Sequence, residues 1–254
     1  MKRLLFFFKN LLFPPKCVGC REFIQKNLFE PCEIPLCEKC RVMWEYEKLA
    51  PCPDCGLEMT LCNCGSRLLK KLNVDGCAKL VNYSAVRKSV GKSAVLYMKK
   101  HKNKRAFDYF AKQLSYTLYG RLKELERKKA IIAFVPRSRK SFVKFGVDQS
   151  KEIAKRLSRL CGIDLACLFV RRGTKSAEQK KLSLSERIEN AKNAYKISRN
   201  AVKTLENVDT VFVVDDVLTS GASLAGCIFA LKEVYKGKIV CVTLARTGKK
   251  QKNN

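Results

Sequence analysis

The segment best able to do chemistry joins two acidic residues to a turn of small residues. An apolar run over residues 211–214 is followed by Asp215 and Asp216, and the small residues come shortly after them. Carboxylates at the carboxyl end of a strand can accept hydrogen bonds from sugar hydroxyls or hold hydrated Mg²⁺. The N–H groups of a small-residue turn that opens a helix can bind phosphate. The predicted site therefore has Asp215 and Asp216 as its catalytic acidic pair and a phosphate turn made of Thr219, Ser220, Gly221, Ala222 and Ser223.

This segment has two other interpretations. Adjacent acids after a strand also occur in Walker B motifs, but those require a phosphate loop elsewhere in the chain. Gly91-Lys92-Ser93 is similar to the end of such a loop, yet Val86 stands where its first glycine should be. The other interpretation is purely structural, with an aspartate and a serine capping a helix.

Paired cysteines are the second group with chemical potential. The chain has 14 cysteines, and ten of them stand at or before residue 77. Four of these form two Cys-x-x-Cys pairs separated by sixteen residues, which is the spacing of a tetrahedral zinc site. Four thiolates leave no open position for a substrate, so we expect a structural Zn²⁺. Its predicted ligands are Cys17, Cys20, Cys37 and Cys40.

A second set of cysteines follows directly, so one or two zinc ions are possible. Its first half is a good metal-binding turn, because Gly56 after Cys55 can adopt the left-handed conformation. Its second half has only one residue between the cysteines, too few for the usual turn. The candidate ligands are Cys52, Cys55, Cys62 and Cys64; Cys32 and Cys77 are spare thiols, and Cys161, Cys167, Cys227 and Cys241 lie in apolar segments as expected core residues.

The charge of the chain predicts a polyanionic partner. Lys and Arg number 52 against 23 acidic residues, a net charge of +29. Residues 87–129 hold 14 basic residues and 3 acids, and residues 136–175 hold 11 and 3. Nucleic acid, phosphorylated metabolites or an anionic membrane would be attracted, although a general excess of lysine is the alternative explanation. The predicted nucleic-acid contacts are Lys99, Lys100, Lys102, Lys104 and Arg105.

We expect a cytoplasmic protein, with a peripheral position on the inner face of the membrane as the alternative. Lys9 and Asn10 interrupt the apolar start, and no small-residue cleavage site follows it. No stretch of about 18 apolar residues occurs, so we expect no transmembrane segment. The first thirteen residues are predicted to form an amphipathic helix packed on the body of the protein.

The chain divides by composition into two parts. Residues 1–66 are predicted to form an N-terminal helix and a small zinc ribbon, and residues 67–254 an α/β domain with a mainly parallel central sheet. Residues 173–206 are polar, and we expect a mobile loop followed by a short helix there. Strands are expected at 77–83, 130–135, 165–170, 208–214 and 238–244, and helices at 87–100, 105–128, 149–161 and 223–235.

Together the acidic pair and the small-residue turn resemble the phosphoribosyl diphosphate (PRPP) signature of type I phosphoribosyltransferases. With the cysteine pairs, the chain resembles the ComF family, in which a zinc ribbon precedes such a domain. Residues 135–138, which include Arg137, look like the family's diphosphate loop. Residues 145–150 are similar to its Arg-Gly-Phe-Asn-Gln-Ser element, but Phe145, Val147 and Asp148 depart from it. Residues 171–190 resemble its mobile loop.

The resemblance implies a protein that binds PRPP with Mg²⁺ and single-stranded DNA, acting in the cytosolic step of natural DNA uptake beside proteins of the uptake machinery. It implies that Arg137 binds diphosphate. No pocket for an acceptor base can be identified, so catalysis stays open. The alternatives are an active phosphoribosyltransferase with an unknown acceptor and a non-catalytic zinc-ribbon adaptor.

Overall fold

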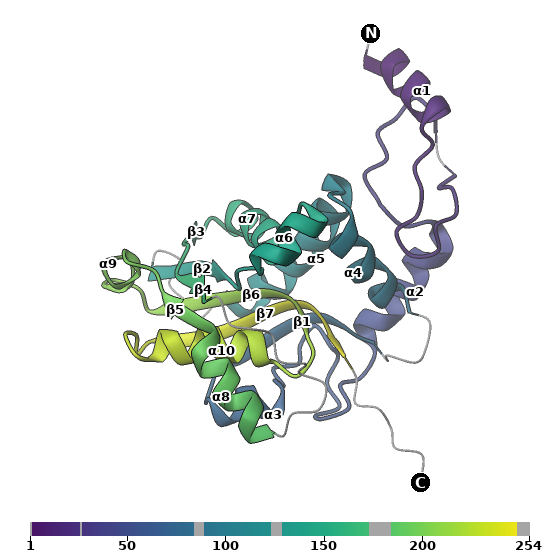
Figure 1. The fold of residues 1–254 in the computed structure, drawn as a ribbon. Helices are drawn as coiled ribbons and strands as arrows, with labels where there is room; N and C mark the ends of the chain where they lie inside the picture. The colour runs from purple at the N-terminus through teal and green to yellow at the C-terminus, as the bar shows by residue number, and fades with distance from the viewer. Residues whose placement is uncertain (1, 26, 84–88, 123–128, 173–183, 248–254) are drawn as a thin grey trace.

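The computed structural model describes residues 2–25, 27–83, 89–122, 129–172 and 184–247. It confirms an α/β fold with a parallel central sheet and a cysteine-rich N-terminal region (Figure 1). The helices are α1 (Lys2–Leu12), α2 (Glu38–Leu49), α3 (Arg67–Lys71), α4 (Val90–Lys100), α5 (Lys104–Leu122), α6 (Arg139–Phe145), α7 (Gln149–Cys161), α8 (Leu184–Ala194), α9 (Ala201–Leu205) and α10 (Ala222–Lys232). The strands are β1 (Gly76–Tyr83), β2 (Ala130–Phe134), β3 (Asp164–Leu165), β4 (Phe169–Arg171), β5 (Tyr195–Ile197), β6 (Thr210–Leu218) and β7 (Lys238–Thr247).

The central sheet has five strands in the order β1-β7-β6-β2-β3, and every neighbouring pair is parallel. From β2 the chain crosses through α6 and α7 to β3, on one side. From β6 it crosses through α10 to β7, on the other side. The direction of winding therefore reverses between β2 and β6, and the carboxyl ends of parallel strands at such a reversal form a natural ligand crevice.

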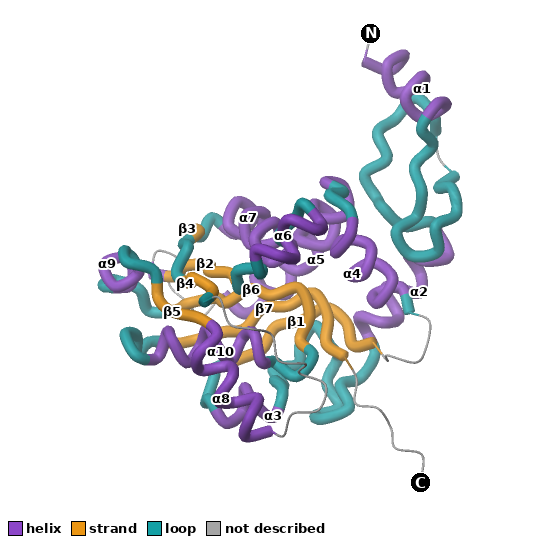
Figure 2. The backbone as a smooth tube through the Cα atoms, in the orientation of Figure 1, coloured by secondary structure: helices purple, strands orange, loops and turns teal. Residues whose placement is uncertain are grey.

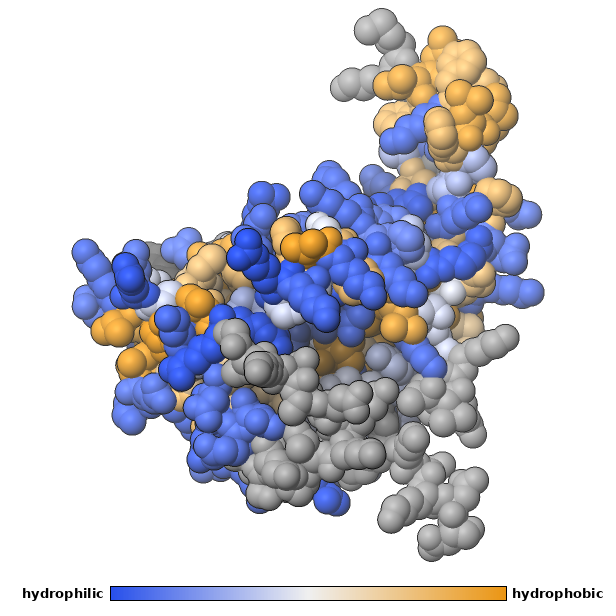
Figure 3. Space-filling view, in the orientation of Figure 1, coloured by the Kyte–Doolittle hydropathy of each residue, from blue (hydrophilic) through white to orange (hydrophobic). Residues whose placement is uncertain are grey.

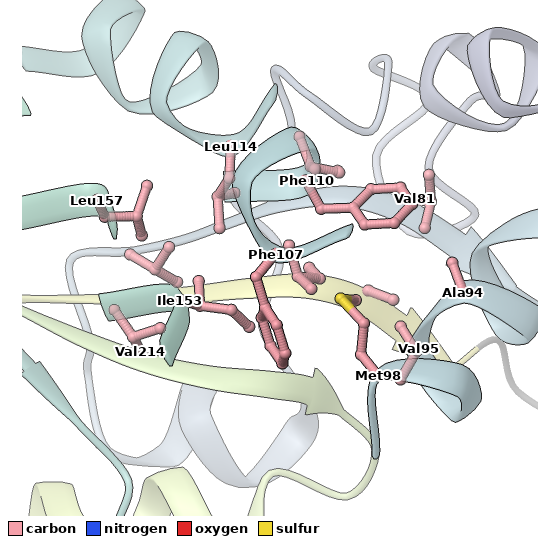
Figure 4. Close-up of a cluster of buried hydrophobic side chains, with 14 of the residues drawn as sticks. Val81, Ala94, Val95, Met98, Phe107, Phe110, Leu114, Ile153, Leu157 and Val214 are labelled. Atoms are coloured by element: carbon pink, nitrogen blue, oxygen red, sulfur yellow. The ribbon is translucent and has the colours of Figure 1, made fainter. Parts of the chain in front are cut away.

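Helices cover both faces of this sheet, as Figure 2 shows. On one face, α4, α5 and α7 bury Met98, Phe107, Phe110 and Leu157 against the strands, because their apolar residues recur every three or four positions (Figure 4). On the other face, α10 is apolar on all sides and lies under α8 and α3. Gly226 of α10 allows α8 to pack closely, since a Cβ there would meet the Ala191 carbonyl of α8 and the ring of Tyr195 in β5.

The cysteine-rich region is joined to the α/β domain through α2. The ring of Trp44 packs edge-on against Phe110 of α5, with ring centroids 4.8 Å apart. The carboxylate of Glu47 accepts hydrogen bonds from the first N–H groups of α4, those of Val90 (2.7 Å) and Gly91 (2.8 Å). A carboxylate at this position satisfies unpaired N–H groups and interacts favourably with the helix dipole.

Most predicted elements occur within a few residues of their expected bounds, and α7 has the predicted bounds. Asp148 begins α7 by accepting a hydrogen bond from the Lys151 backbone N–H, and Gly162 ends it in the left-handed conformation. The single strand expected at 165–170 is wrong. It divides into β3, at the edge of the main sheet, and β4, which pairs antiparallel with β5, because the chain turns away after the Ala166 N–H bonds to Ile132 O.

The expected loop at 173–206 also differs. Residues 173–183 lie outside the described residues. The rest forms α8, β5 and α9, a longer ordered stretch than the short helix expected. Among the cysteines expected in the core, Cys161, Cys227 and Cys241 are buried but Cys167 is exposed.

Helix α1 does not pack on the body of the protein, contrary to the prediction. It lies at the far end of the cysteine-rich region (Figure 1), where the buried Asn10 amide donates to the carbonyls of Leu28 and Glu30 and Phe7 stacks on Phe29. Figure 3 shows apolar side chains gathered on this part. The exposed ones are Leu4, Leu5, Phe8, Leu11, Leu12 and Phe13.

Candidate functional site

The acidic pair lies at the crevice between β2 and β6. Phe134, the last residue of β2, pairs with Val214, so the loop after β2 runs beside the two acids. We predicted that strand β6 ends before Asp215. In the structure it continues to Leu218, because β7 pairs with it as far as that residue. The two acids therefore lie within a paired strand, and the pairing of that strand in the sheet fixes their position.

The surroundings of Asp215 disfavour its ionised form. Burial, followed by the charge of Asp216, raises its pKa to about 7. Its Oδ1 accepts hydrogen bonds from the Ser150 hydroxyl and from the Asp216 N–H, both 2.9 Å long, which partly offset this. Two adjacent carboxylates repel each other when both are ionised. A divalent cation or sugar hydroxyl donors relieve this repulsion, so the pair favours such ligands.

Asp216 has a cationic neighbour. The Lys99 ammonium at the end of α4 lies 3.4 Å from its Oδ2. Burial and then the charge of Asp216 raise the pKa of the Tyr83 hydroxyl. Lys99, predicted as a nucleic-acid contact, is therefore held at the acidic pair.

The predicted phosphate turn ends at the N-terminus of α10. Gly221 precedes the helix with a φ of 81°, a conformation that other residues rarely adopt. A Cβ at Gly221 would also meet the Ser66 hydroxyl and Leu69 of α3. Thr219, Ser220 and Ser223 of this turn are exposed. The turn thus joins the carboxyl end of β6 to the start of an eleven-residue helix, whose Ala222 N–H donates to the Ser220 hydroxyl (3.4 Å).

Arg137 follows β2 but is held within its own loop. Its guanidinium donates to Val147 O (2.7 Å) and to Gln149 Oε1 (2.6 Å), and lies 4.9 Å from the centre of the Phe145 ring. Its backbone N–H donates to Asp148. Residues of the 145–150 element therefore fix Arg137 in place.

Both four-cysteine groups could hold a metal ion. In each group the four Sγ atoms lie within 4.8 Å of one another. In the first, burial disfavours the Cys17 thiolate, but N–H groups of Cys37, Cys20 and Gly19 outweigh it and lower the pKa of Cys17 to about 7. Burial and the neighbouring sulfurs raise the pKa of Cys40 far above its ordinary value. A divalent metal relieves this conflict by offsetting part of the negative charge of the assembled thiolates, which suits structural zinc.

The second group is complete despite its short spacing. Cys64 N–H donates to Cys62 Sγ (3.2 Å), so a one-residue gap still brings both sulfurs together. Gly56 adopts the left-handed conformation expected of it, with a φ of 74°. In the first group Arg21 takes the equivalent conformation.

The other predicted nucleic-acid residues lie at the α4–α5 junction. Lys100, Lys102 and Lys104 are exposed there. Arg105 instead turns inward, and its guanidinium donates to the carbonyls of Cys32 and Lys16.

Three residues near these sites were missed from sequence. Ser150 is a hydrogen-bond donor to Asp215, and Lys79 and Arg246 contact the second cysteine group. Lys79 and Arg246 carried a signal, because a charged residue within an otherwise apolar strand needs a buried partner.

No family model matches the chain, and no curated protein matches it. Within the described residues, no helix is both long enough and apolar enough to cross a membrane.

Proposed function

We propose that the protein binds PRPP, or a related ribose 5-phosphate ester, together with Mg²⁺ in the crevice between β2 and β6. The observation that carries this proposal is the position of the acidic pair, on the strand where the sheet reverses its winding and whose end leads through the phosphate turn into α10. Ligands of open α/β sheets bind at such a reversal.

Each part of the crevice matches one part of the ester. The N–H groups and hydroxyls from Thr219 to Ser223 would bind the 5′-phosphate. Asp215 and Asp216 would accept hydrogen bonds from the ribose hydroxyls or from water bound to Mg²⁺. Lys99 supplies positive charge beside Asp216, and Arg137, on the loop after β2, would supply it for the diphosphate.

Calorimetric titration with Mg²⁺-PRPP tests the proposal. Wild type should bind, and Asp215→Asn and Asp216→Asn should each weaken binding at least about tenfold, as loss of a charged hydrogen-bond partner does. Asp209→Asn is the matched control, because Asp209 is an exposed acid beside the opposite end of β6. Absence of binding to wild type would end the proposal.

We also propose that single-stranded DNA binds beside the α4–α5 junction. A groove of about 910 Å³ opens there between α1, the loop at residues 31–34 and α5. Lys104 and Lys112 line it, and so do Tyr109 and Tyr116. Tyr116 is exposed and available for stacking, whereas Phe107 and Phe110 of the same helix are buried. A basic groove with accessible aromatic rings is the usual design for binding single strands.

Fluorescence anisotropy with a labelled oligonucleotide tests the DNA site. Affinity should fall with added salt, with a logarithmic slope of about −0.7 for each phosphate contact. The triple variant Lys100→Gln, Lys102→Gln, Lys104→Gln should bind more weakly and with a smaller slope. A slope of zero would exclude phosphate contacts. A control with equal loss of charge is Lys203→Gln, Lys236→Gln, Lys238→Gln, at exposed positions toward the other end of the sheet.

These two sites and the cysteine groups support a ComF-like role in the cytosolic handling of incoming DNA, with contacts to uptake proteins and with structural Zn²⁺. The exposed apolar residues of α1 support a peripheral membrane position as the alternative to a free cytoplasmic one. Phosphoribosyl transfer is a second candidate function, since the acidic pair and the phosphate turn are both present. Product formation from PRPP with any acceptor would establish it. Binding to a partner that does not depend on PRPP and is lost in Cys17→Ser would favour the non-catalytic zinc-ribbon adaptor instead.

A further inference from the structure

The second cysteine group is in contact with two buried cations from the central sheet. Lys79 of β1 is 0% exposed and Arg246 of β7 is 7% exposed. The Lys79 ammonium lies 3.3 Å from Cys62 Sγ, and the Arg246 guanidinium lies 3.9 Å from Cys52 Sγ. Each cation therefore touches one half of the group.

Backbone contacts hold both cations in place. The Lys79 ammonium also donates to the carbonyls of Cys62 (3.2 Å), Cys64 (2.9 Å) and Cys77 (3.1 Å). Arg246 is shared between Cys52 and the carboxylate of Asp54. Within the described residues, Lys79 has no ion pair with a carboxylate, so the sulfur group is the anionic surface that it faces.

The first cysteine group has a different environment. In the part of the chain that the structure describes, its sulfurs receive the Gly19 N–H and contact one another, with no lysine or arginine within hydrogen-bond distance. A zinc ion with four thiolates carries two negative charges. Burying such a group is costly unless cations compensate it.

We propose that Lys79 and Arg246 are outer-shell residues of a metal site at Cys52, Cys55, Cys62 and Cys64, and that this metal supports the phosphate turn. The two cations stabilise the dianionic metal–thiolate group and bind it to β1 and β7. The second cysteine group thus belongs structurally to the α/β domain, although it precedes residue 66.

Two sets of contacts join this metal site to the phosphate turn. Gly65 and Ser66 follow Cys64 directly, and the Ser66 hydroxyl lies against Gly221 at the start of α10. Along the sheet, Arg246 is in register with Leu218, the residue before the turn. Loss of the metal would loosen both sets of contacts and with them the phosphate turn, so we expect weaker binding of phosphate esters. This last step rests on the proposed function of the crevice.

Zinc release tests the assignment independently of PRPP. Fully loaded protein is mixed with excess chromophoric chelator, and release is followed in time. Replacing one outer-shell partner commonly weakens metal binding about 10- to 100-fold. We therefore expect Arg246→Met and Lys79→Met to accelerate release of one zinc by about tenfold, and Cys55→Ser to abolish that phase while the first group keeps its zinc.

Arg156→Met is the matched control, because Arg156 is a largely buried arginine with ion pairs to Asp108 and Glu152 and, among the residues that the structure describes, no hydrogen bond to sulfur. If Lys79→Met fails to fold, Arg246→Met and the milder Arg246→Lys carry the test. Unchanged zinc release in folded Arg246→Met would overturn the assignment.

PRPP binding is then measured on protein depleted of that zinc. Retained zinc kinetics with no PRPP binding to wild type would sink the proposed function and leave the metal assignment intact.

Discussion

Asp215→Asn should stabilise the free protein while it removes PRPP binding. Ionisation of Asp215 is disfavoured in the crevice, because burial and then the charge of Asp216 raise its pKa from 3.8 to about 7. Asparagine has nearly the same shape, and its carbonyl can still accept from the Ser150 hydroxyl and the Asp216 N–H. The substitution therefore removes one charge and keeps the local geometry.

The size and pH range of the effect follow from linkage. A carboxyl group whose pKa is raised by folding favours the folded state only while it is protonated, so stability is lost as the pH rises from about 4 to about 7. One pKa unit is worth about 1.4 kcal/mol, which sets a ceiling of about 4 kcal/mol above pH 7. Structural relaxation and the partial exposure of Asp215 reduce this to about 1–2 kcal/mol. The melting temperature should rise by about 3–6 °C at pH 8.

Thermal unfolding of wild type and Asp215→Asn at pH 8 and pH 5 measures this effect. The gain should be largest at pH 8 and should shrink at pH 5, where Asp215 is protonated in the folded protein. Asp209→Asn is the control, because Asp209 is exposed and paired with Lys129. Equal destabilisation of Asp215→Asn at both pH values would refute the reasoning.

Three further predictions concern the neighbouring structure. Gly221→Ala should lower the free energy of unfolding by about 1–3 kcal/mol in urea titrations, and should weaken Mg²⁺-PRPP binding, because its φ is positive and a Cβ would meet Ser66. Glu47→Ala should cost about 1–2 kcal/mol in the same assay, since two N–H groups of α4 lose their acceptor. Chelation should shift the emission of Trp44, the single tryptophan, to longer wavelength as α2 separates from α5; an unchanged spectrum with both zinc ions gone would contradict it.

Helix α7 and strand β3 show what could and could not be predicted for the fold. The apolar spacing of α7, with Asp148 before it and Gly162 after it, defines a helix locally, because capping and periodicity act over a few residues. Strand β3 could not be predicted as separate from β4. Pairing with distant strands decides where such short strands end, and that information is not local.

The candidate site shows the same division. Asp215, Asp216 and the turn through Ser223 form one continuous segment, so their types and order were sufficient to predict a phosphate ester site. The contacts of Arg137 with Val147 and Gln149 were not predictable, because a loop conformation determines them.

The sequence by itself determined the cysteine pairs, the acidic pair, the small-residue turn and the excess of positive charge, because each depends on residues that are close together in the chain. Tertiary structure alone decided which distant groups meet them. It placed Lys99 on Asp216, Ser150 on Asp215, and Lys79 and Arg246 on the second cysteine group. Such charges and hydroxyls find their partners only when the sheet brings separate strands and helices into register, since burial makes each of them depend on the group it faces.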